Sequence, residues 1–106
     1  MAMKTKRRYL LVECATAIEE RGRAQFERGL FKALLEQMGV LHYQSANPKM
    51  VGFVDAHRFV LRASLEGHKE MALALAMIKN LEGAETAFYT LKSSGTIKAL
   101  MKEGKK

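Results

Sequence analysis

The chain has 106 residues, of which 48% are hydrophobic and 27% are charged, and its formal net charge is +7. This length predicts one domain, residues 1–106, and argues against a second. No apolar run reaches the ~18 residues of a membrane helix, and the N-terminus "MAMKTKRR" lacks the apolar part of a secretion signal. The single cysteine, Cys14, excludes an internal disulfide framework and favours a reducing compartment. We therefore expect a cytoplasmic protein that has no membrane partner.

The first half of the chain predicts a strand, a helix and a hairpin. "RRYLLVECA" (7–15) has the β-branched and aromatic residues of a strand. Residues 23–38 have the helical period, with one apolar stripe and one polar stripe, and Gly39 is the expected helix stop. "MVGFVDA" (50–56) and "RFVLRASL" (58–65) predict two strands with a tight connection near Asp55.

The second half predicts a helix, a strand and a short terminal helix. Residues 67–81 carry an apolar stripe at helical spacing, and "AETAFYTL" (84–91) predicts the last strand. Ser94 is the expected cap of the terminal helix. We expect this helix to face the core with three side chains: Ile97, Leu100 and Met101.

The order β-α-β-β-α-β predicts an α+β fold, the ferredoxin-like (RRM-like) α/β sandwich, with a four-stranded antiparallel sheet and two helices on one face. Right-handed crossovers give the strand order 4-1-3-2. The start of the first strand then lies beside the end of the fourth. Two basic segments that are far apart in the sequence should therefore form one surface.

That surface is the candidate binding site of the chain. A net charge of +7 favours an anionic partner, with nucleic acid first. The joint "LKSSGTIKAL" (91–100) combines hydroxyls, a glycine and lysines at a helix start, which is typical of a phosphate site. An ordinary capped helix between solvated basic tails is the alternative. The candidate RNA-binding residues are Lys4, Lys6, Arg7, Arg8, Lys92, Ser93, Ser94, Gly95, Thr96, Lys98 and Lys102.

Three segments, "RRYLLVE", "RFVLR" and "FYTLKSSGTIKAL", in this order and spacing resemble protein component 2 of archaeal ribonuclease P. The eukaryotic ribonuclease P/MRP relatives of this family share the first and last of these segments. The last segment is the most specific. The resemblance implies an RNA-binding subunit of the ribonucleoprotein that removes the 5′ leader from precursor tRNA. It also implies that the RNA carries the chemistry, so magnesium is expected with the RNA and no cofactor in the protein. The implied partners are the ribonuclease P RNA, the barrel-shaped protein component 3 and, through the complex, precursor tRNA.

The sequence offers no catalytic or metal site. The three histidines lack metal-ligand spacing, and no nucleophile–base pair or nucleotide-binding motif is present. Asp55 fits a turn residue better than a catalytic acid. "AHRFVLRAS" lacks the base-stacking motif of RNA-recognition sheets, and Phe59 alternates with core positions while Arg58 and Arg62 fall on the other face. RNA contact should therefore be mainly to phosphate.

The second helix is apolar around much of its circumference, which indicates that another element or chain packs on the side that faces away from the sheet. We call this packing partner the second cover of the helix. A protein partner could supply it through Leu73, Ala76 and Met77, and a homodimer contact is possible. Alternatively, the terminal helix or the segment after Met38 packs there. Two other functions remain open: a ferredoxin-like regulatory or ligand-binding domain that self-associates, and another RNA-binding protein such as a ribosome-associated factor.

Overall fold

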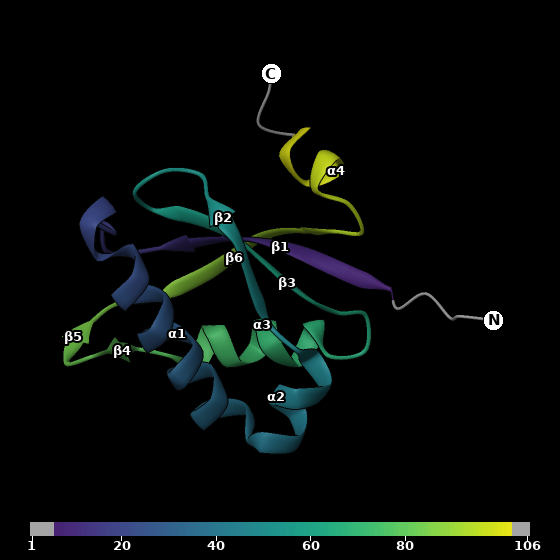
Figure 1. Cartoon of the computed structure of the whole chain (residues 1–106), viewed down its shortest axis with the longest axis horizontal. Helices are drawn as coiled ribbons and strands as arrows, with labels where there is room; N and C mark the ends of the chain where they lie inside the picture. The colour runs from purple at the N-terminus through teal and green to yellow at the C-terminus, as the bar shows by residue number, and fades with distance from the viewer. Residues whose placement is uncertain (1–5, 103–106) are drawn as a thin grey trace.

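A four-stranded antiparallel sheet lies at the centre of the computed structural model, which describes residues 6–102 apart from the side chain of Lys102 (Figure 1). Its strand order is β2-β3-β1-β6. The strands are β1 (Arg7–Cys14), β2 (Lys49–Phe53), β3 (Arg58–Ser64) and β6 (Phe88–Ser94). The predicted ferredoxin-like fold and strand order are confirmed.

Helices cover one face of this sheet, and a short helix lies on the other (Figure 1). After the 3-10 turn η1 (Glu20–Gly22), the covered face carries α1 (Arg23–Met38), α2 (Val40–Ala46) and α3 (His68–Met77). The helix α4 (Ile97–Lys102) contacts β6 and β1 from the opposite side, which we call the outer face. The expectation of two helices on one face missed α2. Gly39, at φ 85°, ends α1 as predicted, but the chain starts a new helix at the next residue.

Alternating residues of the strands form the core. Leu10 and Val12 of β1 and Phe59 and Leu61 of β3 are fully buried beneath the helices. Phe26 of α1 packs edge-on against Phe59, with ring centroids 5.5 Å apart. The interpretation of Phe59 as a core residue, rather than a base-stacking one, is confirmed.

The predicted helix over 67–81 ends four residues early, at Met77. Ile78 is extended and buried, and a two-stranded hairpin follows, β4 (Asn80–Leu81) and β5 (Ala84–Glu85). A turn forms here although the helical spacing of apolar residues predicted a longer helix. Gly83 has φ 85°, and its N–H donates to Asn80 Oδ1 at 3.1 Å, which stabilises the turn. The last strand consequently starts at Phe88 rather than at residue 84. Among the described residues, no helix has the length and hydropathy to cross a bilayer.

The terminal helix α4 does not join the main core. Of its three predicted core residues only Leu100 is buried, whereas Ile97 and Met101 are 41% and 38% exposed. The helix packs on the outer face of the sheet, so its contact area is small. It therefore cannot supply the second cover of α3. The segment after Met38 does contact α3, because it forms α2.

Candidate nucleic-acid interface

The end of β6 lies beside the start of β1, as the strand order requires. Tyr9 pairs with Ser94, and Leu10 pairs with Ser93. One residue further towards the N-terminus, Arg8 donates from Nη2 to Ser93 Oγ at 3.2 Å. The joint and the first strand thus share a side-chain contact between residues that are 85 positions apart.

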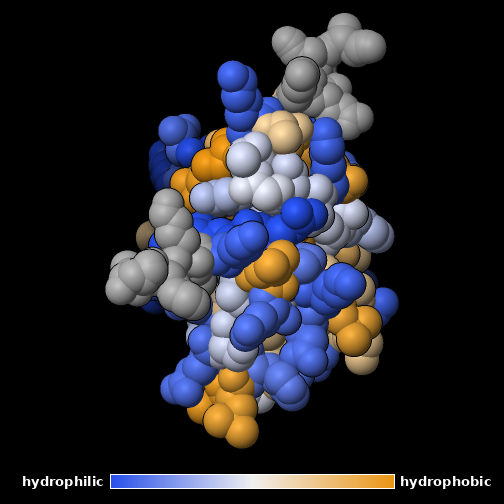
Figure 2. All heavy atoms as spheres, turned by 90° about the vertical axis from the view of Figure 1, so that its right-hand side faces the viewer, coloured by the Kyte–Doolittle hydropathy of each residue, from blue (hydrophilic) through white to orange (hydrophobic). Residues whose placement is uncertain are grey.

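We call this region the basic end of the sheet and define it by Lys6, Arg7, Arg8, Lys92 and Lys98. Lys6, Arg7 and Lys98 are exposed, and Arg8 and Lys92 are half-buried. Figure 2 views the side of the molecule from which β1 starts, and it shows a band of hydrophilic side chains across this side. Of the predicted site residues, Lys4 and the side chain of Lys102 lie outside the described part of the chain.

The start of α4 is capped by Thr96 and not by Ser94. Thr96 Oγ1 accepts the N–H of Ala99 at 3.1 Å, three residues on, which is the geometry of an N-cap. Ser94 Oγ instead accepts the N–H of Thr96 at 3.4 Å. The sequence misplaced the cap because α4 begins at Ile97, so that the residue directly before the helix is Thr96, while Ser94 still belongs to β6.

The three hydroxyls of the joint are therefore already used as acceptors, Ser93 towards Arg8 and the other two towards backbone N–H groups. Each hydroxyl keeps its own proton for donation. Because α4 has only six residues, its dipole and free N–H groups make a weak anion site. The charge at this end of the molecule comes from lysine and arginine side chains, and the hydroxyls serve to fix the joint.

Lys92 and Lys98 differ in their surroundings. Lys92 lies against α4, where its Nζ donates to the carbonyl of Ala99 at 3.1 Å, while Lys98 is exposed on the helix. Lys92 thus helps to hold α4 on the sheet. Its half-buried position follows from the β-bulge at Leu91, which shifts the register so that Lys92 pairs with Leu11.

Gly95 is less constrained than the predicted phosphate site requires. A Cβ added there would lie 3.7 Å from Arg8 Nη1, an ordinary contact, and no positive φ demands glycine. The glycine therefore leaves open space beside Arg8 but is not forced by the backbone.

The structure adds two basic residues that the sequence did not nominate. Lys49 of β2 pairs with Arg62 of β3, and Arg62 pairs with Tyr9 of β1, so these side chains form a row on the outer face. The alternation of inward and outward residues in β3 predicted that Arg62 lies on this face. Which residues lie beside Arg62 depends on the pairing register of β3 with β1 and β2. The register of β2 is shifted by a bulge after Met50, which the sequence pattern does not reveal.

Arg58 faces the same side but is neutralised. Its Nη2 lies 2.7 Å from Asp55 Oδ2, and Asp55 Oδ1 accepts the N–H groups of His57 and Arg58 at 2.9 Å. The hydrogen bond from Arg58, followed by that from the His57 backbone, lowers the pKa of Asp55 below its ordinary value. Asp55 is thus a turn residue, as predicted, and Arg58 is not part of the free positive charge.

The histidines are engaged separately. The Nδ1 atoms of His42, His57 and His68 contact the backbone carbonyls of Met38, Cys14 and Leu65 at 2.8–3.2 Å. Among residues 6–101, no cluster of three or more histidine, cysteine or acidic side chains could hold a metal ion.

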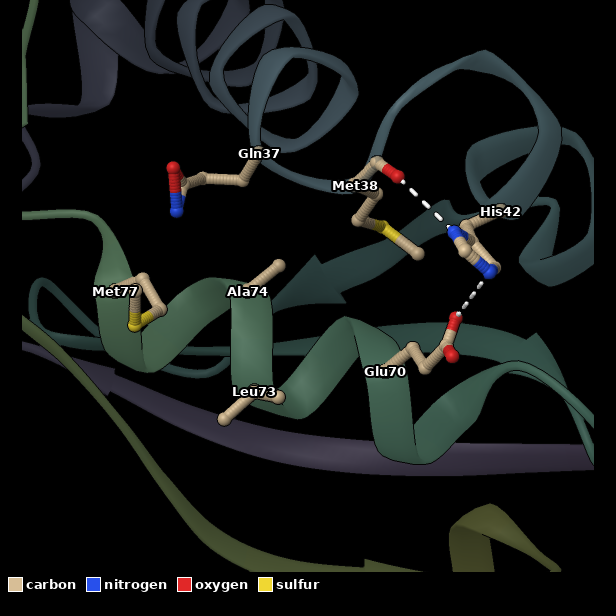
Figure 3. Close-up of a pocket in the computed structure, with 7 residues that line it drawn as sticks. All are labelled: Gln37, Met38, His42, Glu70, Leu73, Ala74 and Met77. Carbon is tan, nitrogen blue, oxygen red and sulfur yellow. Dashed lines mark hydrogen bonds and ion pairs between the residues drawn. The ribbon is translucent and has the colours of Figure 1, made fainter.

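A second surface lies on the helical side of the molecule. There the end of α1, the start of α2 and one face of α3 enclose a groove of about 230 Å³ (Figure 3). Leu73 and Met77 border it and are 65% and 58% exposed, and Ala76 beside them is also exposed. His42 closes one end of the groove, with Nε2 lying 3.5 Å from Glu70 Oε1. The three predicted interface residues are therefore accessible.

Comparison with known proteins relates the chain to a family. The family model described as the Rpp14/Pop5 family matches residues 8–105. The structure also resembles a chain of a solved complex, the cryo-EM structure of yeast ribonuclease MRP, with a TM-score of 0.63. The two chains are 11% identical, and the match covers 97% of this chain and 94% of the yeast chain, which shows a shared fold. The comparison with curated proteins gives no significant match.

Proposed function

Because the chain belongs to the Rpp14/Pop5 family, a family of ribonuclease P and ribonuclease MRP protein components, we propose that it is an RNA-binding subunit of ribonuclease P. In this role it supports the maturation of precursor tRNA at the 5′ end. The RNA carries the chemistry together with its own magnesium, and the protein positions and neutralises the RNA. Protein component 3 of the enzyme is the proposed protein partner.

The observation that carries the RNA-binding role is the convergence at the basic end of the sheet. Arg8 contacts Ser93 across the pair β1–β6, so the cations of the first strand and those of the joint share one surface. Within residues 6–101, neither Arg7 nor Arg8 nor Lys98 forms an ion pair with a carboxylate. Unpaired cations on a fixed scaffold suit contacts to RNA phosphates, which position a protein without reading sequence.

The groove beside α3 supports the proposal of a protein partner. Leu73 and Met77 expose apolar surface on a regular helix, at the border of a hollow that a side chain of another protein can fill. Such anchors in a pocket typically supply much of the affinity of a protein interface. The groove lies on the helical side of the sheet, whereas α4, which follows the joint, lies on the opposite side.

Reconstitution tests this function. The ribonuclease P RNA from the same source is assayed for precursor-tRNA cleavage with and without this protein and component 3, across a magnesium titration. We expect the two proteins together to lower the magnesium concentration needed for cleavage, because they replace part of the cation requirement of the RNA. Identical magnesium curves with and without this chain, in the presence of component 3, would contradict the proposal.

The same assay separates support from catalysis. Single replacements of Asp55, Glu13 or His57 that preserve folding should leave cleavage active, since the protein holds no reacting group. Loss of turnover in one of these variants, with complex assembly intact, would overturn the assignment of the chemistry to the RNA.

A further inference from the structure

A cleft opens where the end of α2 meets the ends of β1 and β3. Its volume is about 280 Å³, and the residues that define its chemistry are Arg7, Gln44, Ser45, Asn47, Arg62 and Ser64. We call it the α2 cleft. It differs from the joint at β6, because its walls come from α2 and β3 and it shares only Arg7 with the basic end of the sheet.

Two arginines supply the charge of the α2 cleft. Arg7 pairs with Ser64 across β1 and β3, and Arg62 precedes Ser64 by two residues on the same face. The two arginines are therefore diagonal neighbours, with Cα atoms about 7–8 Å apart. No acidic residue lines the cleft, and within residues 6–101 neither side chain forms a hydrogen bond or an ion pair. Two unpaired guanidinium forks can hold a phosphate group from two sides.

The wall formed by α2 is fixed in place by short contacts. Ser64 Oγ donates to the carbonyl of Ser45 at 2.8 Å and accepts the N–H of Gly67 at 3.0 Å. Gly67 also allows a close approach, since an added Cβ would lie only 2.5 Å from the Cα of Ala46. The distance between α2 and the end of β3 is thus set by packing, and the cleft is preformed.

Two amide side chains lie at the opposite wall. Asn47 ends α2 in the left-handed region, with φ 49° and its N–H bonded to the carbonyl of Tyr43 at 2.8 Å. Gln44 lies one turn earlier on the same helix. Both are exposed, and within the described residues neither amide group makes a hydrogen bond. A carboxamide offers one acceptor and two donor hydrogens, the complement of a base edge.

We propose that the α2 cleft binds one unpaired ribonucleotide, with its phosphate between Arg7 and Arg62 and its base edge against Gln44 and Asn47. The volume lies near the lower limit of about 300 Å³ for ligand pockets and is far too small for a double helix. In an RNA duplex the Watson–Crick edges are already paired, and the major-groove edges lie in a deep, narrow groove that short amides do not reach, so the proposed base is an unpaired one.

This inference rests on the proposed RNA-binding function and adds a discriminating contact to it. The basic end of the sheet neutralises phosphates of any RNA. The α2 cleft would favour a loop, bulge or single strand beside the docked helix. It would therefore decide where along the RNA the protein settles.

Paired variants test the proposal. The probes are a fluorescein-labelled single-stranded RNA and an RNA duplex with the same number of phosphates, titrated by fluorescence anisotropy at several salt concentrations. The cleft variants are Arg62→Ala, Gln44→Ala and Asn47→Gly, where glycine preserves the left-handed backbone. The control is Arg28→Ala, which removes the same charge from an exposed position on α1.

We expect Gln44→Ala and Asn47→Gly each to weaken single-strand binding about three- to tenfold, and to leave duplex binding and both salt slopes unchanged. Arg62→Ala should flatten the single-strand slope of log K against log salt by about 0.7, one phosphate contact, whereas Arg28→Ala should not. The proposed nucleotide site would be overturned if Gln44→Ala and Asn47→Gly weaken binding of the single strand and the duplex equally. It would also be overturned if Arg62→Ala keeps the parental salt slope. Circular dichroism verifies the fold of each variant.

The nucleotide site in the α2 cleft and the proposed ribonuclease P function can be refuted separately. If the parent binds the ribonuclease P RNA and the cleft variants match it on every probe, the cleft is wrong and the function stands. If the parent prefers single strands through the cleft but neither binds that RNA nor lowers its magnesium requirement, the function is wrong and the cleft stands.

Discussion

The basic end of the sheet and the groove beside α3 differ in the kind of side chain that they present to a partner. At the basic end, Arg7, Arg8 and Lys98 have no carboxylate partner within residues 6–101, and Arg8 is held by the Ser93 hydroxyl. In the groove, apolar side chains stand on a regular helix, and His42 and Glu70 meet at one end with Nε2 and Oε1 3.5 Å apart. The first surface suits long-range attraction to an anion, and the second suits short-range packing. The two surfaces therefore suit the two proposed partners, an RNA and a protein.

The largest effect is expected at the groove. Leu73→Glu together with Met77→Lys places charges on the apolar wall and should weaken binding of component 3 by more than about thirtyfold, which corresponds to a loss of ~2 kcal/mol. RNA binding should persist, since both residues are remote from the strand ends. Isothermal titration calorimetry with component 3 gives the affinity.

The matched control for this pair is Leu91→Glu, which adds a charge at a 47% exposed leucine on β6. It should leave the affinity for component 3 at the parental value. An unchanged affinity in the Leu73 and Met77 double variant would show that the groove does not bind component 3, and the two surfaces would then not differ in function.

The next effect concerns the basic end. Arg7→Ala and Lys98→Ala should each remove about one phosphate contact and flatten the slope of log K against log salt by roughly 0.7–0.9. Partner binding should not change. Filter binding of the ribonuclease P RNA across a salt series measures this slope. If both variants keep the parental slope, Arg7 and Lys98 do not contact RNA phosphates and are ordinary solvated residues.

Lys92→Ala should behave differently from these two variants. Its Nζ is bonded to the carbonyl of Ala99, so the change should also loosen α4 from the sheet. Hydrogen exchange of the α4 amides should accelerate in Lys92→Ala and stay parental in Lys98→Ala. The same exchange rate in both variants would show that Lys92 does not hold the helix.

A smaller effect distinguishes the cap of α4 from the other hydroxyls. Thr96→Ala removes the acceptor of the Ala99 N–H and should destabilise α4 by about 1 kcal/mol, whereas Ser94→Ala should cost less. Amide exchange within α4 reports the local free energy. Equal losses in the two variants would contradict the assignment of Thr96 as the cap.

The smallest effect is expected at the hairpin between β2 and β3. The pKa of Asp55 is lowered in the folded state, so its contribution to stability is present above the unfolded pKa of about 3.9 and is lost as the pH falls through the lower folded value. Asp55→Asn should therefore lower the melting temperature by about one to a few degrees at neutral pH. The two proteins should converge in strong acid. A constant difference at every pH would assign the effect to the turn geometry and not to the charge.

Much of the candidate site followed from strand order alone. Period-2 runs at "RRYLLVECA" and "RFVLRASL" and a helical period over 23–38 determine the ferredoxin-like topology, because only a few right-handed connections of these elements bury their apolar faces. That topology already places Arg7 and Arg8 beside the joint. The alternation in β3 likewise determined that Phe59 is buried and that Arg62 faces outward.

Tertiary structure decided the features that depend on register, turns and competition between neighbours. The segment after Gly39 became α2, which packs against α1 and α3, and the end of the predicted helix over 67–81 became a hairpin that turns at Gly83. Thr96 rather than Ser94 capped α4, because the helix begins at Ile97. A β-bulge in the last strand placed Lys92 opposite Leu11, where its side chain lies against α4. The α2 cleft depends on the close approach of Gly67 to Ala46, a contact between residues with no shared pattern in the sequence. Periodicity specifies which face a residue occupies, but the neighbours it meets there are set by packing across the whole chain.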